Sequence, residues 1–94
     1  MGKSVKSESS VQKEIIEYLE EKGMYVIKIV RANKGGVSDL AVCYDGKFIA
    51  IEVKAEGKKN TATHLQKHHQ YLVTQSGGKA FIADSVWDVM EQGL

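Results

Sequence analysis

The chain has 94 residues, of which 43% are hydrophobic and 27% are charged. A chain of this size and composition is expected to form one compact soluble domain, which excludes collagen-like and disordered classes. A single cysteine, Cys43, cannot form an internal disulfide, and the sequence has neither a CxxC motif nor a Cys/His zinc pattern, which favours a reducing, intracellular setting. Apolar runs far shorter than the roughly 20 residues that cross a bilayer, and an N-terminus without an apolar signal core, predict neither membrane insertion nor secretion.

The formal net charge is only +1, but the charge is unevenly distributed along the chain. Residues 28–79 hold nine Lys or Arg and four acids, whereas residues 1–27 and 80–94 are both net acidic. Two interpretations stay open for the basic middle, a phosphate-facing surface or a set of solvated lysines. The surface would be built from Lys28, Arg31, Lys34, Lys54, Lys58, Lys59 and Lys67.

Hydrophobic periodicity and turn residues predict an α/β domain over residues 1–94, with 1–7 as a flexible tail. The predicted elements are, in chain order, a helix from about 7–10 to 22, strands 25–30, 39–44 and 48–53, a helix from 61 or 63 to 75, a strand 79–83 and a last helix from 86. The order α-β-β-β-α-β-α predicts a mixed sheet flanked by helices, because a helical crossover brings the final strand in parallel to a neighbour.

The firmest local prediction is an antiparallel hairpin around Asp45-Gly46, a dipeptide that tolerates the positive φ angles of a two-residue turn. Counting outward from this turn places Tyr44 opposite Lys47 and Asp39 opposite Glu52. The hairpin therefore brings two carboxylates together at the end of a core strand.

Opposed carboxylates on one face of a sheet repel unless positive charge lies between them. Because side chains alternate along a strand, Glu52 and Lys54 share one face while Val53 packs on the other. A hard divalent cation bound by the two carboxylates, with the Lys54 ammonium beside it, would offset their repulsion. The same residues also fit a second interpretation, in which Lys54 neutralises Asp39 and Glu52 in an ion-pair network.

The first helix adds a third acid. Glu8 and Gln12 fall on the apolar stripe of this helix, so Glu8 is expected to point inward, where a carboxylate needs a partner or a metal. The alternative places Glu8 in a frayed first turn, stabilised by the helix dipole.

Polar residues of the middle helix are further candidates. Gln66 lies on the shoulder of its apolar stripe and is expected to orient a water, a phosphate or Lys54, or to be a half-buried amide. His68 and His69 fit either phosphate contact or packing and solvation. Trp87 and the tyrosines are not interleaved with basic residues and are interpreted as core or rim residues, not as base-stacking platforms. The apolar stripe of this middle helix, beside which Gln66 lies, consists of Ala62, Leu65, His69, Leu72 and Val73.

Together these residues resemble the PD-(D/E)xK nuclease superfamily, and within it the VRR-NUC (virus-type replication-repair nuclease) group. The resemblance covers nearly the whole chain. Ser38 stands where that group usually has proline, a position that shapes the approach to the acid without ligating metal. The matching positions are, in order, Glu8 with Gln12, Gly36-Val37-Ser38-Asp39, Glu52-Val53-Lys54, and Thr63 with Gln66.

The resemblance implies a restriction-endonuclease-like fold and an Mg²⁺- or Mn²⁺-dependent DNA endonuclease. Asp39, Glu52 and the carbonyl of Val53 would hold the metal, and Glu8 would complete the site or bridge to it through water. Lys54 would position the attacking water or stabilise charge in the transition state, and Gln66 is the fifth expected catalytic residue.

The resemblance also implies partners. Small standalone members of the group look like Holliday-junction resolvases, which implies a homodimer acting on branched DNA, of viral or mobile-element origin. An alternative of a different class is a non-catalytic DNA-binding or assembly module that keeps the fold, and RNA is a third possible substrate. The residues expected to contact DNA are Arg31, Lys34, Lys58, Lys59, Lys67 and His68.

Overall fold

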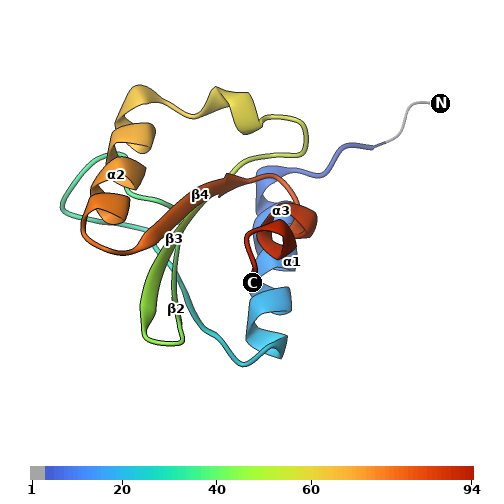
Figure 1. The fold of residues 1–94 in the computed structure, drawn as a ribbon. Helices are drawn as coiled ribbons and strands as arrows, with labels where there is room; N and C mark the ends of the chain where they lie inside the picture. Colours follow the sequence, from blue (N-terminus) through green and yellow to red (C-terminus); the bar gives the residue numbers. More distant parts are fainter. Residues whose placement is uncertain (1–3) are drawn as a thin grey trace.

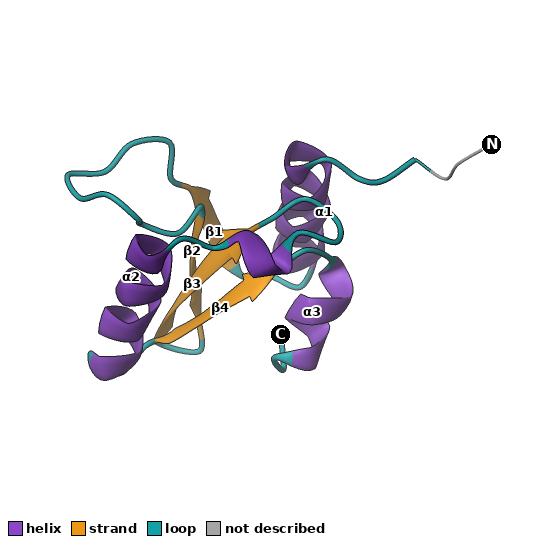
Figure 2. Ribbon diagram, turned by 90° about the horizontal axis from the view of Figure 1, so that it is seen from above, coloured by secondary structure: helices purple, strands orange, loops and turns teal. Residues whose placement is uncertain are grey.

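The structure, a computed structural model, describes residues 4–94 and has the predicted order α-β-β-β-α-β-α. Helices flank the two faces of one sheet, with α2 on one side and α1 and α3 together on the other (Figures 1 and 2). The elements are α1 (Glu8–Glu21), β1 (Tyr25–Lys28), β2 (Leu40–Tyr44), β3 (Lys47–Val53), a 3-10 turn (Lys59–Thr61), α2 (His64–Gln75), β4 (Lys79–Ala83) and α3 (Val86–Glu91).

The sheet is mixed, as the sequence predicts, with the strand order β1-β2-β3-β4. β1, β2 and β3 pair antiparallel, and β4 joins β3 in parallel after the crossover through α2. Asp45 and Gly46 both have positive φ, 52° and 76°, and Tyr44 pairs with Lys47. The predicted hairpin and its register are therefore confirmed, although β1 ends at Lys28, two residues earlier than expected.

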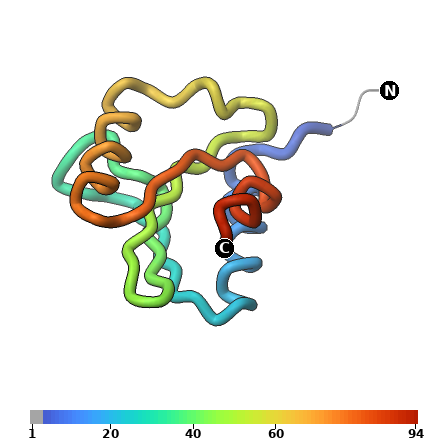
Figure 3. The backbone as a smooth tube through the Cα atoms, viewed as in Figure 1, coloured from blue at the N-terminus to red at the C-terminus, as the bar shows by residue number. Residues whose placement is uncertain are grey.

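The apolar core lies between the sheet and the pair α1 and α3. Alternate residues of β2 and β3 point into it and are almost completely buried, and the two terminal helices lie side by side against them (Figure 3). Burial of such side chains provides most of the favourable free energy of folding. The largest fully buried side chains are Ile15, Leu19, Leu40, Ile51, Val11, Val42, Val53 and Val89.

The apolar stripe of α2 is less buried than its spacing predicts. This helix packs against β3 and β4, yet among the described residues it contributes no fully buried side chain. Leu65 is 51% exposed and Leu72 is 41% exposed. The apolar stripe thus marks the side of α2 that packs on β3 and β4, but it remains partly open to solvent at Leu65 and Leu72.

The segment before α1 is bonded to the loop after β3. Lys6 N donates to Glu56 Oε1 (2.9 Å) and Glu56 N donates to Lys6 O (3.0 Å), while Ser7 caps α1 by accepting from Ser10 N. Residues 1–3 of the predicted tail lie outside the described residues. Across residues 4–94, no helix is both long enough and apolar enough to cross a bilayer.

Candidate active site

The predicted meeting of Asp39 and Glu52 occurs at the open end of the β2–β3 hairpin. Leu40 and Ile51 form the last ladder pair, so the next residues outward are Asp39 and Glu52. Asp39 Oδ2 accepts a hydrogen bond from Val53 N (2.8 Å), and the Asp39 carbonyl accepts one from Ile29 N (2.8 Å). Asp39 is thus fixed by both neighbouring strands, beside the carboxylate of Glu52.

Glu52 is a buried acid with an unsatisfied oxygen. Its side chain is 3% exposed, and Oε2 accepts from Gln66 Nε2 (3.0 Å) and lies 3.6 Å from Lys54 Nζ. Oε1 is buried with no hydrogen-bond partner among the described residues. Burial, followed by the negative charge of Asp39, raises the pKa of Glu52 to about 7, and Lys54 opposes this shift only in part.

Gln66 connects both charged residues of the Glu52-Val53-Lys54 strand end to α2. Its Oε1 accepts from Lys54 Nζ (3.1 Å) and from Thr63 N (2.9 Å), and its own backbone N–H donates to Thr63 Oγ1 (3.1 Å). The last two bonds form a capping box at the start of α2. The predicted contact of Gln66 with Lys54 is therefore present, and the capping box is a contact that sequence reasoning did not identify.

The donor set suits a hard divalent cation. An orphaned, buried carboxylate oxygen is costly, and a second carboxylate beside it increases the cost, whereas a bound cation lowers both. Carboxylate and carbonyl oxygens are the ligands that Mg²⁺ and Mn²⁺ prefer, and Asp39, Glu52 and the Val53 carbonyl can provide them. Within residues 4–94, no group of three or more His, Cys, Asp or Glu side chains gathers as a metal cluster, so the side-chain ligands available are two.

Glu8 differs from expectation. It is the first residue of α1 and is exposed, so the prediction of a buried, inward-pointing acid was wrong, and the alternative of a first-turn acid describes its position. Gln12, one turn later, is 7% exposed, as its place on the stripe predicts. The helical pattern gave the correct face of α1, but its first turn extends beyond the buried part of the sheet.

The glycine-rich loop before Asp39 packs against α2. A Cβ atom at Gly36 would lie 2.6 Å from Leu65 Cγ and 2.7 Å from the Leu65 carbonyl oxygen, and Gly36 has a φ of +76°. Only glycine fits so close a contact in this backbone conformation. Ser38, at the position where the VRR-NUC group usually has proline, is buried.

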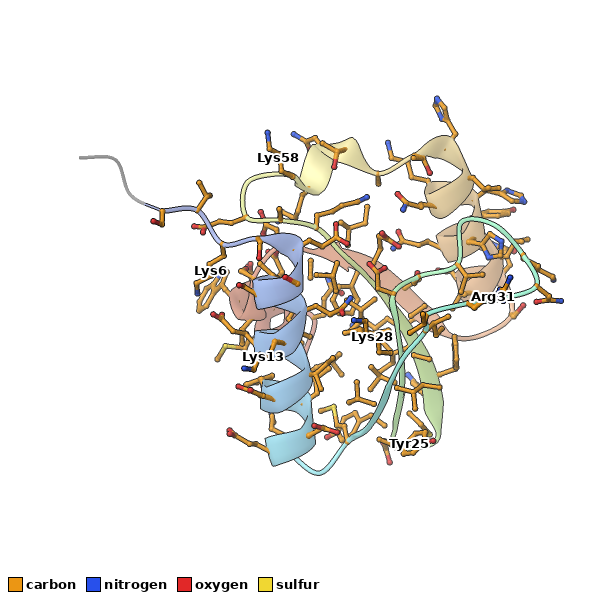
Figure 4. The ribbon with its side chains drawn as sticks, turned by 180° about the vertical axis from the view of Figure 1, so that it is seen from behind. Lys6, Lys13, Tyr25, Lys28, Arg31 and Lys58 are labelled. Carbon is orange, nitrogen blue, oxygen red and sulfur yellow. The ribbon has the colours of Figure 1, made fainter. Side chains whose placement is uncertain are left out.

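The residues predicted to contact DNA lie on three segments, which are the loop after β1, the loop after β3 with its 3-10 turn, and α2. Figure 4 shows Lys58 in the loop after β3 and Arg31 in the loop after β1. Lys59 Nζ is paired with Asp88 Oδ1 (2.9 Å), which raises the pKa of Lys59 and partly neutralises its charge. The ring of His68 stacks on Tyr71 at 6.5 Å between centroids. All six residues predicted to contact DNA are exposed, namely Arg31, Lys34, Lys58, Lys59, Lys67 and His68.

Sequence reasoning also missed a link that holds the loop after Lys54. Gly57 N donates to Asp84 Oδ2 (2.9 Å), and Asp84 N donates to Asp88 Oδ2 (3.0 Å). Together with the Lys59–Asp88 pair, these bonds attach the loop to the beginning of α3. No sequence signal marks this link, because the loop residues Gly57 and Lys59 are far along the chain from their partners Asp84 and Asp88.

Comparison with known proteins relates this chain to a phage protein. It is 31% identical over 87 residues to the protein named "Putative nuclease p44" of Acyrthosiphon pisum secondary endosymbiont phage 1, and the alignment covers 84% of this chain and 94% of the relative. The chain belongs to the family of that phage protein. No family model and no solved structure matches the chain significantly.

Proposed function

We propose that the protein is a metal-dependent DNA endonuclease of the PD-(D/E)xK type, and a nuclease of the VRR-NUC group. The observation that carries the proposal is the buried Glu52 carboxylate, with one oxygen unpaired among the described residues, beside Asp39 and Lys54. The family supports it, since the phage relative is named as a nuclease. The phage relative also makes the interior of an infected bacterium the expected setting.

The proposed metal ligands are Asp39, Glu52 and the Val53 carbonyl, with two side chains as the only carboxylate ligands found among residues 4–94. Bound Mg²⁺ or Mn²⁺ would supply Lewis acidity toward a phosphate and lower the pKa of water. The protein holds the two carboxylates in place beforehand, because the Val53 amide fixes Asp39 and Gln66 fixes Glu52. Fixed ligands need no reorganisation when the substrate binds.

Lys54 is proposed as the residue that acts on the phosphate group. Its ammonium side chain is only 12% exposed and is held by Gln66 Oε1 and Glu52 Oε2 on the same side of the sheet as the carboxylates. An ammonium group that is shielded from solvent stabilises negative charge on a phosphate more strongly than one in water, because the local dielectric constant is lower. Lys54 also orients the attacking water by hydrogen bonding.

DNA is the proposed substrate, and branched DNA such as a four-way junction is the proposed preferred form. The predicted cations are all exposed and come from three segments, which suits contact with phosphates more than the reading of base edges. A homodimer would place two symmetric sites on two strands. The exposed side chains of Tyr25, Ile27 and Phe48, which line one pocket on the sheet, provide apolar surface for such an association.

A second candidate is a non-catalytic DNA-binding module with the same fold. It is favoured by one observation: Glu52 Oε2 already accepts from Gln66 Nε2 and forms an ion pair with Lys54, so a polar network exists at this oxygen without a metal. In that case, Asp39 and Glu52 stabilise the structure instead of holding a cation.

A cleavage assay separates the two candidates. The purified protein is incubated with a labelled four-way junction, a splayed duplex, a linear duplex and a single-stranded RNA, each in EDTA, Mg²⁺ or Mn²⁺. The proposal predicts metal-dependent cutting that is strongest on the junction and is lost in Asp39→Asn. A folded protein that binds the junction and cuts no substrate with either metal would support the binding module.

A further inference from the structure

The first turn of α2, residues 63–66, contacts both halves of the candidate site. We propose that this turn is a clamp that positions the reactive groups, with Thr63 and Leu65 as its positioning residues. The inference rests on the proposed nuclease function. Thr63 acts on Glu52 and Lys54 through Gln66, and Leu65 acts on Asp39 through the glycine-rich loop.

The Thr63 arm of the clamp is the capping box. Gln66 Oε1 accepts from both Thr63 N (2.9 Å) and Lys54 Nζ (3.1 Å), and Nε2 of the same amide donates to Glu52 Oε2 (3.0 Å). Because an amide group is planar, fixing its oxygen at Thr63 also fixes the direction of its N–H donors. The cap therefore determines where Gln66 meets both charged residues.

The Leu65 arm of the clamp is a contact with the loop that leads to Asp39. Cβ atoms built at Gly35 and Gly36 would lie 3.0 Å from Leu65 Cδ2 and 2.6 Å from Leu65 Cγ, so the loop backbone runs directly over this side chain. Two residues after Gly36 comes the buried Ser38, and then Asp39. The same turn of α2 thus supports the backbone on the Asp39 side of the site.

The contacts of this turn are important because, within residues 4–94, no fully buried side chain of its own holds α2 in position on the sheet. None of the side chains of this helix is fully buried in the described structure, so its position relative to β3 depends on a few specific contacts. Loss of the Thr63 hydroxyl removes the bond from Gln66 N that caps the first turn. The Thr63 N–H that donates to Gln66 Oε1 is retained, but the turn that carries this N–H loses its cap. The expected result is a folded protein in which Gln66 no longer holds Lys54 and Glu52 in one arrangement.

The test compares Thr63→Val with Thr63→Ser, which keeps the hydroxyl. The control is Thr74→Val, the same change in the same helix, where Thr74 Oγ1 donates only to Gln70 O. On the junction with Mn²⁺, we expect Thr63→Val to lower kcat by about 10- to 100-fold with KM changed less than about 2-fold. Thr63→Ser should restore kcat to within about 3-fold of the wild type, and Thr74→Val should match the wild type.

A second readout does not require activity. Hydrogen exchange of the Gln66 side-chain amide, followed by NMR, should be faster in Thr63→Val and unchanged in Thr63→Ser and Thr74→Val. If the wild type cuts no DNA, the proposed function fails, and this exchange measurement still tests the clamp. Wild-type exchange in Thr63→Val, or wild-type kcat where the enzyme is active, would overturn the Thr63 arm.

The Leu65 arm has its own variant. Gly36→Ala places a Cβ against Leu65 and should lower kcat by about 10-fold or more while the far-ultraviolet circular dichroism keeps its helical signal. Gly23→Ala is the matched control, because Gly23 also has a positive φ but a Cβ there meets no atom within 4 Å. Equal kcat values for Gly36→Ala and Gly23→Ala would overturn this arm.

Discussion

The two faces of the sheet differ in how they are covered. The face under α1 and α3 is sealed by fully buried aliphatic side chains, whereas α2 leaves Leu65 and Leu72 half-exposed on the other face. The buried acid, Glu52, lies on this second face. The comparison indicates that the first face provides the stability, and that the second face can therefore hold an electrostatically costly group.

β3 contributes side chains both to the apolar core and to the face that carries Glu52. Ile49, Ile51 and Val53 point to the sealed face, and Phe48 and Glu52 point to the other. The chemistry-bearing residue is thus held by neighbours that are themselves fixed in the core. Substitutions on the two faces should consequently have separable effects on stability and on activity.

The largest expected effect is on activity, at Asp39. Asp39→Asn keeps an oxygen to accept from Val53 N but removes the charge. We expect kcat to fall by at least about 10³-fold, because stabilisation by a bound metal contributes several kcal/mol to the transition state. The free energy of unfolding, measured with urea, should stay within about 1 kcal/mol of the wild type. A retained kcat would contradict the assignment of Asp39.

The next effect is on stability, at Ile15 on the sealed face. Ile15→Ala removes a side chain that is 0% exposed and should lower the free energy of unfolding by about 3 kcal/mol. At a temperature where the variant is fully folded, kcat should change less than about 2-fold, since the site lies on the opposite face. A large loss of kcat in folded protein would show that the two faces are coupled.

The third prediction concerns pH. Glu52 has a folded-state pKa of about 7 and an ordinary value of 4.5, so the folded protein binds the extra proton between these values. In EDTA, stability should therefore fall as pH rises from about 4.5 through about 7, by up to about 3 kcal/mol.

Glu52→Gln is the matched control for the pH prediction. It should lack this part of the pH dependence and should equal or exceed the wild type in stability at pH 8, because it removes the buried charge. Denaturant titrations of both proteins across the pH range provide the measurement. Parallel curves for the two proteins would contradict the raised pKa.

The smallest expected effect is at Leu72 on the open face. Leu72 is 41% exposed, and Leu72→Ala should lower the free energy of unfolding by less than about 1 kcal/mol, against the larger loss at Ile15. A much larger loss that depends on protein concentration would show that this face is buried in a homodimer, which light scattering would confirm.

Much of the fold follows from local sequence signals. Asp45-Gly46 predicted the hairpin and hence the meeting of Asp39 with Glu52. The observed capping residues Ser7, Thr63 and Ser85 lie within or next to the predicted starts of the three helices. These signals work because a turn or a cap depends on a few adjacent residues.

The errors concern relations between elements. Periodicity shows which side of a helix is apolar but not how far a neighbouring element covers it, so the burial of Glu8 was overestimated. The bridging bonds of Gln66 depend on how α2 sits on β3, and the Lys59–Asp88 pair joins residues far apart in the chain. Neither arrangement has a signature within a short window of sequence.

The most direct test of the central claim is the binding of Mn²⁺ measured by calorimetry at pH 6 and pH 8. We predict one site per chain, tighter binding at pH 8, and release of a proton at pH 6, because the carboxyl of Glu52 must ionise to bind the ion. Asp39→Asn and Glu52→Gln should both abolish binding. No Mn²⁺ binding to the folded wild type at either pH, or unchanged binding by the two variants, would contradict the claim that these carboxylates form a metal site.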